Sequence, residues 1–165
     1  FKDESWLVFD GATGIGNGKI IPAGPLRETL ENGEKRGDYV LIMGEDKTGL
    51  AQRCSLPVYY GRLKPQPFDL ENKRVLAFAG IGHPEKFYQT LKSIGYVPVI
   101  TRDFPDHHTY TAAELDELRT TAAMQGLTPV TTEKDYVKLP ESVRKDIYCL
   151  KVRAEWRDKP FTNKD

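Results

Sequence analysis

The sequence predicts an α/β protein in which helices cover both faces of a mostly parallel sheet, a three-layer α/β/α arrangement. Short apolar runs typical of buried parallel strands recur along the chain, at residues 6–9, 39–43, 75–79, 97–100, 129–132 and 147–152. In the second half these runs alternate with helical patterns of about 10–15 residues, which is typical of parallel strands joined by right-handed crossovers.

Length and composition limit the classes of protein that the chain can belong to. Its 165 residues suffice for one domain, or for a small domain plus a remnant of another. Lys and Arg together number 24 and are balanced by 24 Asp and Glu, which argues against a basic surface for nucleic acid. Cys54 and Cys149 lie too far apart for a metal motif or a disulfide framework. With 39% hydrophobic and 29% charged residues, the chain is expected to be soluble. No apolar run approaches a membrane span of about 18 residues.

The first part of the chain is predicted to be a remnant of an upstream sheet. Its strands are Trp6–Phe9 and Tyr39–Met43, with a polar stretch at residues 32–38 between the connecting loop and the second strand. Cys54–Leu63 is followed by two prolines and is predicted to be an edge strand or an extended connector. We place the boundary near Pro67, so that residues 1–66 form the remnant and connector and residues 67–165 form the α/β/α domain.

The second part of the chain contains residues that typically begin and end helices. Pro84 suits the first turn of a helix that stops at Gly95, with apolar residues at helical spacing at Phe87, Leu91 and Ile94. Thr111 and Glu114 form a capping box for a helix that ends at Gly126. Residues 133–139 are expected to be a loop or a turn of helix, and residues 140–145 a short helix.

The loop after the first strand is the first candidate site. Gly14, Gly16 and Gly18, with Asn17 among them, would let the backbone approach a ligand. The loop closes on a stiff Pro-Ala-Gly-Pro segment that presents Arg27 and Glu28, a planar cation and a hard oxygen ligand that suit a phosphate and its metal ion. Alternatively, the glycines form an ordinary connector and the charged pair a solvated helix start. Neither a Walker A loop nor a dinucleotide fingerprint is matched.

Further polar clusters follow the strands of the second part, where doubly wound sheets bind ligands, at residues 80–83, 103–108 and 131–135. His107 or His108 could accept a proton from a hydroxyl nucleophile, oriented by a carboxylate such as Asp106. The alternative is a helix cap with both histidines exposed. Residues 131–135 place hydroxyls, two carboxylates and the ammonium of Lys134 at one strand end, and charged runs of this kind are usually solvated helix starts.

Four motifs, in order, resemble those of one family: VFDGATGIGNGKIIPAGPLRE, AFAGIGHPEKFYQTLKSIG, FPDHHTY and VTTEKDYVKLP. The chain is thereby similar to the tetraacyldisaccharide 4'-kinases, which phosphorylate an acylated glucosamine disaccharide of the lipid A pathway with ATP. The resemblance implies a P-loop-kinase-like fold. Because the family's P-loop and a second acidic motif lie upstream of these motifs, we expect the chain to be a carboxy-terminal portion that is inactive alone.

The resemblance also implies roles for residues. Arg27 would stabilise the transferring phosphoryl group, and Glu28 would bind Mg²⁺ or orient the arginine. The glycine loop (Gly14, Gly16, Asn17, Gly18) and Lys134 would contact ATP. His107 matches a family histidine that pairs with an upstream aspartate, whereas His108 stands where an aromatic residue is frequent.

The implied partner is the acylated disaccharide, at the cytoplasmic face of the bacterial inner membrane, which the upstream part would contact. Two rival interpretations stay open: a non-catalytic Rossmann-like module that binds nucleotide or acyl-sugar, and an unrelated Rossmann-like oxidoreductase or transferase using Gly80 and Gly82.

Overall fold

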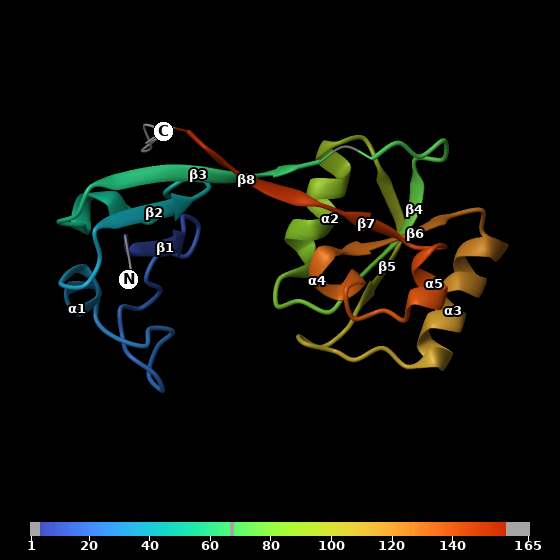
Figure 1. The fold of residues 1–165 in the computed structure, drawn as a ribbon, viewed down its shortest axis with the longest axis horizontal. Coiled ribbons are helices and arrows are strands. Elements are labelled where there is room, and N and C mark those ends of the chain that lie inside the picture. Colours follow the sequence, from blue (N-terminus) through green and yellow to red (C-terminus); the bar gives the residue numbers. More distant parts are fainter. Residues whose placement is uncertain (1–3, 67, 158–165) are drawn as a thin grey trace. The chain divides into compact units, whose positions relative to one another are not determined.

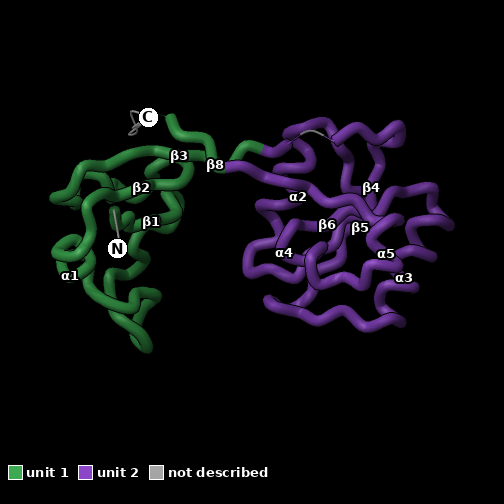
Figure 2. The backbone as a smooth tube through the Cα atoms, viewed as in Figure 1, with its two compact units in different colours: residues 1–64, 154–165 green, residues 65–153 purple. Residues whose placement is uncertain are grey.

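The structure, a computed structural model, describes residues 4–66 and 68–157. The chain forms two compact units (Figure 2), one of residues 1–64 and 154–165 and one of residues 65–153. The chain therefore enters the second unit once and returns from it once. The predicted boundary near Pro67 places everything after residue 66 in one domain, whereas the structure groups Ala154–Arg157 with the first unit.

The first unit contains a mixed four-stranded sheet in the order β1-β2-β3-β8. β1 (Trp6–Asp10), β2 (Tyr39–Met43) and β3 (Val58–Pro65) run parallel, with Trp6 opposite Tyr39 and Val40 opposite Val58. β8 (Val152–Trp156) runs antiparallel to β3, since the Arg157 N–H donates to the Tyr60 carbonyl and the Gln66 N–H to the Lys151 carbonyl, each at 2.8 Å. β3 is thus an interior strand, and the expectation of an edge strand or connector there is wrong.

One face of this sheet carries the core of the first unit. Val40 and Ile42 of β2 are fully buried and pack with Ile15 of the loop and with Leu50 of the 3₁₀ helix η1 (Leu50–Arg53). The opposite face carries aromatic side chains from all four strands. The Trp6 ring centroid lies 4.6 Å from that of Tyr39, 5.5 Å from Tyr59 and 5.3 Å from Trp156.

The second unit contains a parallel sheet in the order β5-β4-β6-β7. Its strands are β4 (Arg74–Ala79), β5 (Val97–Asp103), β6 (Thr128–Thr132) and β7 (Tyr148–Leu150). Figure 1 shows α2 (Pro84–Ser93) and α3 (Ala112–Met124) on opposite sides of this sheet. The short helices α4 (Glu133–Tyr136) and α5 (Glu141–Arg144) follow β6.

The central strand β4 shows why its sequence is continuously apolar. Val75, Ala77 and Ala79 face α2 and pack against its Phe87 and Leu91. The alternate residues Leu76 and Phe78 face α3 and pack against Leu115 and Leu118. Both faces of the strand are therefore dry, as expected for a parallel sheet. The α/β class with a parallel sheet is confirmed for this unit.

Local sequence signals account for most helix boundaries. The Thr111 hydroxyl accepts a hydrogen bond from the Glu114 N–H at 3.3 Å, and the Glu114 carboxylate accepts one from the Thr111 N–H at 2.7 Å, so the predicted capping box is present. Pro84 stands in the first turn of α2 as predicted. The helix α1 (Leu30–Glu34) was not predicted, because five residues including Gly33 show no helical periodicity. The helices in the described part of the chain are all too short or too polar to cross a bilayer.

The last predicted strand, residues 147–152, is in fact two. Tyr148–Leu150 completes the parallel sheet as β7, and Val152–Trp156 crosses into the first unit as β8. A strand that changes sheets keeps the composition of one strand, so the sequence pattern could not reveal the switch.

We predict that Phe78→Ala lowers the free energy of unfolding of the chain by about 3–5 kcal/mol, because it opens a cavity in a fully buried cluster of the second unit. Urea unfolding followed by circular dichroism measures the change. Met124→Ala, on an exposed side chain of α3, is the control and should change stability by less than about 0.5 kcal/mol. Equal effects of the two substitutions would contradict the packing of Phe78, on β4, against α3.

Candidate functional site

The candidate residues fall into two clusters, one in each unit, and both clusters follow the carboxyl ends of parallel strands. The first is the loop and segment at residues 10–28, which follows β1. The second combines the turn after β5, residues 105–108, with α4 after β6. Each cluster is described within its own unit.

The glycine loop is folded back on itself by successive turns. Gly14, Gly16 and Gly18 have φ values of 54°, 59° and 73°, which favour glycine strongly over other residues. Their N–H groups donate to the carbonyls of Asp10, Thr13 and Ile15 at 2.7, 2.9 and 3.0 Å. These three N–H groups are therefore already satisfied, and they do not fit a cradle of free donors for ATP phosphates.

Asn17 ties the two halves of this loop together. Its Nδ2 donates to the Ala23 carbonyl at 2.8 Å, and its Oδ1 accepts from the Lys19 N–H at 3.1 Å. The Ile21 N–H donates to the Leu26 carbonyl at 2.8 Å and closes the same segment. These hydrogen bonds hold the segment that leads to Arg27 and Glu28 in place, which agrees with the stiffness predicted from its prolines.

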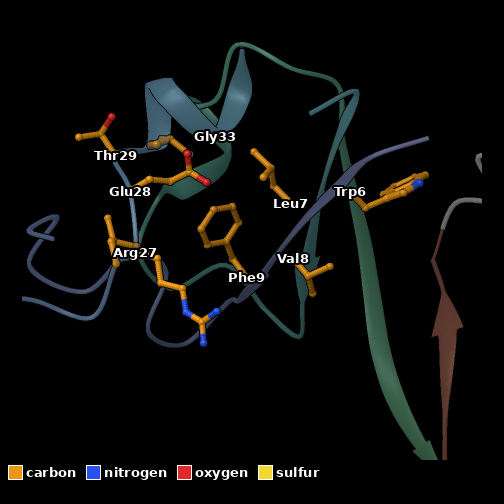
Figure 3. Close-up of a pocket in the computed structure, with 10 residues that line it drawn as sticks. Trp6, Leu7, Val8, Phe9, Arg27, Glu28, Thr29 and Gly33 are labelled. Carbon is orange, nitrogen blue, oxygen red and sulfur yellow. The ribbon is translucent and has the colours of Figure 1, made fainter. Parts of the chain in front are cut away.

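Arg27 and Glu28 point in different directions (Figure 3). The carboxylate of Glu28 lies beside α1 and Gly33, whereas the guanidinium of Arg27 points away from α1. Both residues line a cavity of about 230 Å³ whose apolar walls include Leu7 and Phe9. The two side chains thus do not form the mutual pair that one sequence interpretation suggested.

The two side chains also differ in their electrostatic partners. Glu28 forms an exposed ion pair with Arg36. Arg27 is exposed and has no ion pair among the residues that the structure describes. An arginine held by a stiff segment with its guanidinium available is suited to an incoming phosphate.

The fit of Mg²⁺ to Glu28 is partial. Within residues 4–66 and 68–157, no three His, Cys, Asp or Glu side chains come together as a metal site. Mg²⁺ beside a nucleotide is usually held by one or two carboxylates plus phosphate oxygens, so a single Glu28 could take part only after leaving Arg36.

The turn at residues 105–108 separates the two histidines. The His108 N–H donates to the Pro105 carbonyl at 3.1 Å, and His107 at the top of the turn has a left-handed φ of 62°. The His107 side chain is 77% exposed, and its Nε2 lies 3.7 Å from Oδ2 of Asp106. The ring is thus presented to solvent with a carboxylate beside it.

His108 has a structural partner instead. Its ring is mostly buried, and Nε2 lies 3.1 Å from both carboxylate oxygens of Glu114. The ring also stacks on Phe104 at 4.9 Å. Hydrogen bonds from Thr111 and His108 hold the pKa of Glu114 below its usual value. Of the two histidines, His107 is therefore the one available to a substrate.

Lys134 contacts the same turn. Its ammonium donates to Oδ1 of Asp106 at 2.6 Å, and this hydrogen bond is the main reason that the pKa of Asp106 lies below its usual value. A phosphate contact by Lys134, as the family resemblance implied, would have to compete with this ion pair. Gly80, in the polar cluster after β4, already donates its N–H to Asp135 at 3.0 Å.

Asp135 is a buried carboxylate that sequence reasoning placed in a solvated charge run. Its side chain is 0% exposed and accepts hydrogen bonds from Gly80 N–H at 3.0 Å, the Thr132 hydroxyl at 2.8 Å and the Lys138 ammonium at 3.0 Å. Burial alone would raise the pKa of Asp135, but these donors outweigh it and the pKa lies below its usual value. The detectable signal was Thr132 three residues before Asp135, an N-cap pattern confirmed by the 3.2 Å bond from the Asp135 N–H to the Thr132 hydroxyl.

Each unit is an α/β structure with parallel strands, and loops that follow these strands present an exposed arginine in the first unit and an exposed histidine in the second; in α/β proteins of this class, ligands gather at the carboxyl ends of the strands. Comparison with known proteins makes this class specific. The sequence profile of the family described as LpxK, tetraacyldisaccharide-1-P 4'-kinase, matches residues 1–164. The chain belongs to this family.

Individual relatives agree with the profile. A tetraacyldisaccharide 4'-kinase of Rhodospirillum centenum is 51% identical over 162 residues, covering 95% of this chain and 48% of the relative. The enzyme of the same name from Gluconobacter oxydans is 42% identical over 161 residues, covering 95% of this chain and 49% of the relative. The chain thus spans about half the length of the curated relatives that it matches.

A solved structure shares the fold. The crystal structure of LpxK from Aquifex aeolicus in complex with ATP matches with a TM-score of 0.64 and 22% sequence identity, covering 95% of this chain and 49% of that chain. At this identity the likeness concerns the fold alone.

We predict that Asp135→Asn lowers the free energy of unfolding at neutral pH by about 2 kcal/mol, because the Lys138 ammonium and the other donors lose a charged acceptor. The folded-state pKa of Asp135 is lowered, so the stabilisation is present above the ordinary carboxyl pKa and disappears as pH falls through the folded value. The difference between the two proteins should therefore shrink in acid.

Urea unfolding at pH 7 and below pH 4 tests this expectation. Asp116→Asn, which removes an exposed carboxylate from the ion pair with Arg119, is the control and should cost little at either pH. A difference for Asp135→Asn that grows in acid would mean that the folded protein raises the pKa of Asp135 rather than lowering it.

Proposed function

We propose that this chain is the carboxy-terminal part of a tetraacyldisaccharide 4'-kinase. The whole protein would transfer the γ-phosphate of ATP to the 4'-hydroxyl of a tetraacyldisaccharide 1-phosphate during lipid A biosynthesis. The observation that carries the proposal is the family match over residues 1–164. The first unit, with its parallel β1, β2 and β3, would extend a P-loop-kinase-like sheet, and the second unit would be the three-layer carboxy-terminal domain.

Arg27 and His107 are the residues through which this chain would act. Phosphoryl transfer depends mainly on positioning and on neutralising charge, and an exposed guanidinium on a stiff segment can provide both. His107 would help an acceptor hydroxyl lose its proton, directly or through a carboxylate supplied upstream of this chain. The exposure of His107 and the engagement of His108 with Glu114 support this assignment.

The remaining site residues would have supporting roles. Bound Mg²⁺ would neutralise phosphate charge, with Glu28 as its one candidate ligand in the first cluster. Gly14, Gly16, Asn17 and Gly18 would contribute to ATP binding by shaping the loop, since the three glycine N–H groups are already bonded. Lys134 would reach a phosphate only by giving up Asp106.

The partner would be the acylated glucosamine disaccharide, met at the cytoplasmic face of the bacterial inner membrane. We expect the chain alone to transfer little or no phosphate, because the N–H groups of Gly14, Gly16 and Gly18 are already bonded and cannot cradle a triphosphate. The rival function is a non-catalytic module that binds nucleotide or acyl-sugar.

A chimera tests the proposal. The amino-terminal half of the Rhodospirillum centenum relative, fused ahead of this chain, should phosphorylate tetraacyldisaccharide 1-phosphate with ATP, and His107→Ala should lower kcat by about 10²-fold or more. A folded chimera that binds ATP and acceptor without turnover would favour the rival function.

We predict that Arg27→Ala in the same chimera lowers kcat by about 10³-fold while the KM for ATP changes by much less, because the guanidinium would act on the charge of the transition state. Steady-state kinetics with varied ATP measures both constants. Arg53→Ala, at the exposed end of η1, is the matched control and should leave both unchanged. A higher KM for ATP with kcat nearly unchanged in Arg27→Ala would indicate ground-state binding instead.

A further inference from the structure

We propose that Lys138, held by the buried carboxylate of Asp135, is a positioning residue that fixes the turn carrying His107. The inference rests on the proposed function, because it assigns a task to His107. It concerns residues of the second unit only.

Two lysine side chains donate hydrogen bonds to the turn, one on each side of His107. On the amino-terminal side, the Lys134 ammonium donates to Asp106 Oδ1 at 2.6 Å. On the carboxy-terminal side, the Lys138 ammonium donates to the carbonyl of His108 at 3.3 Å. Lys134 lies in α4 and Lys138 just beyond its end, so one short segment contacts both neighbours of His107.

Asp135 anchors this segment to the sheet. Its Oδ1 accepts from Lys138 at 3.0 Å, while its Oδ2 accepts from the Gly80 N–H at the end of β4 and from the Thr132 hydroxyl at the end of β6. Lys138 therefore bridges a buried carboxylate to a backbone carbonyl of the turn. The same ammonium satisfies both acceptors and fixes their separation.

The turn is also packed closely against this anchor. A Cβ added to Gly80 would lie 3.2 Å from Asp135 Oδ1, from His108 Cβ and from the Pro105 carbonyl oxygen. The Phe104 N–H donates to the Ala79 carbonyl at 2.9 Å just before the turn. The turn thus has little room to relax toward β4.

His107 has a reason to need such support. Its φ of 62° lies in a region that residues with a Cβ adopt at a cost, so surrounding contacts must maintain it. Its ring is 77% exposed, and its own polar contacts are with Asp106: the His107 N–H donates to Oδ1 at 3.0 Å, and Nε2 lies 3.7 Å from Oδ2. The hydrogen bonds from Lys134 and Lys138 to the two flanking residues add to these contacts and help to hold His107 in place.

A double-mutant cycle in the chimera separates positioning from general stability. Lys138→Met should lower kcat about tenfold with the KM for ATP within twofold, because a misplaced catalytic group costs rate without weakening nucleotide binding. In a His107→Ala background, Lys138→Met should lower kcat no further. Lys138→Arg, which retains a donor, should restore part of the rate.

Two further variants serve as comparisons in this test. Lys145→Met removes an exposed lysine beyond α5 and should leave kcat unchanged, whereas Asp135→Asn should reproduce the coupling to His107 seen for Lys138→Met. Thermal unfolding of each variant confirms that kcat is compared between folded proteins.

The kcat values of these variants distinguish a failure of the positioning role of Lys138 from a failure of the proposed role of His107. If Lys138→Met lowers kcat equally with and without His107, or leaves kcat unchanged while His107→Ala lowers it, the positioning role is wrong. If His107→Ala itself leaves kcat unchanged in an active chimera, the proposed role of His107 fails first, and the positioning role with it.

Discussion

The second unit depends most on the hydrogen bonds that the buried carboxylate of Asp135 accepts. A charged group without solvent is tolerated only where donors surround it, and in this unit the donors come from β4, β6 and the residue just past α4. Satisfying one carboxylate therefore fixes two strand ends and a helix in one arrangement. The turn with His107 packs against these elements, so their arrangement sets the position of the turn.

The first unit reaches rigidity by a different route. There the loop after β1 uses positive-φ glycines, an asparagine side chain and backbone bonds to close on itself, and no buried charge among the described residues of that unit is involved. What the loop presents is an exposed arginine on a stiff segment. The two units thus illustrate two ways of presenting a polar group from the end of a parallel strand: a self-closed loop, and a turn fixed by a buried ion pair.

Sequence patterns predicted most strands and the longer helices because burial on both faces and capping leave local signatures. The continuous apolar run of β4 and the Thr111 capping box are such cases. The switch from β7 to β8 could not be predicted, because it depends on pairing with β3, about 90 residues away in the chain. Asp135 was misjudged for a similar reason: a carboxylate among charged neighbours looks solvated until the distant Gly80 N–H is placed beside it. From the residues alone the choice between His107 and His108 stayed open, and the family resemblance favoured His107; the structure adds the contact between His108 and Glu114, which the sequence pattern did not indicate.

We propose that this chain supplies part of a lipid kinase site. The most direct measurement adds this chain in trans to the separately expressed amino-terminal half of the Rhodospirillum centenum relative and maps the phosphorylated product of tetraacyldisaccharide 1-phosphate by ³¹P NMR. We expect a new phosphate at the 4'-hydroxyl that requires ATP and both polypeptides. The same product from the amino-terminal half alone, or none from a mixture shown by size-exclusion chromatography to associate, would contradict the claim.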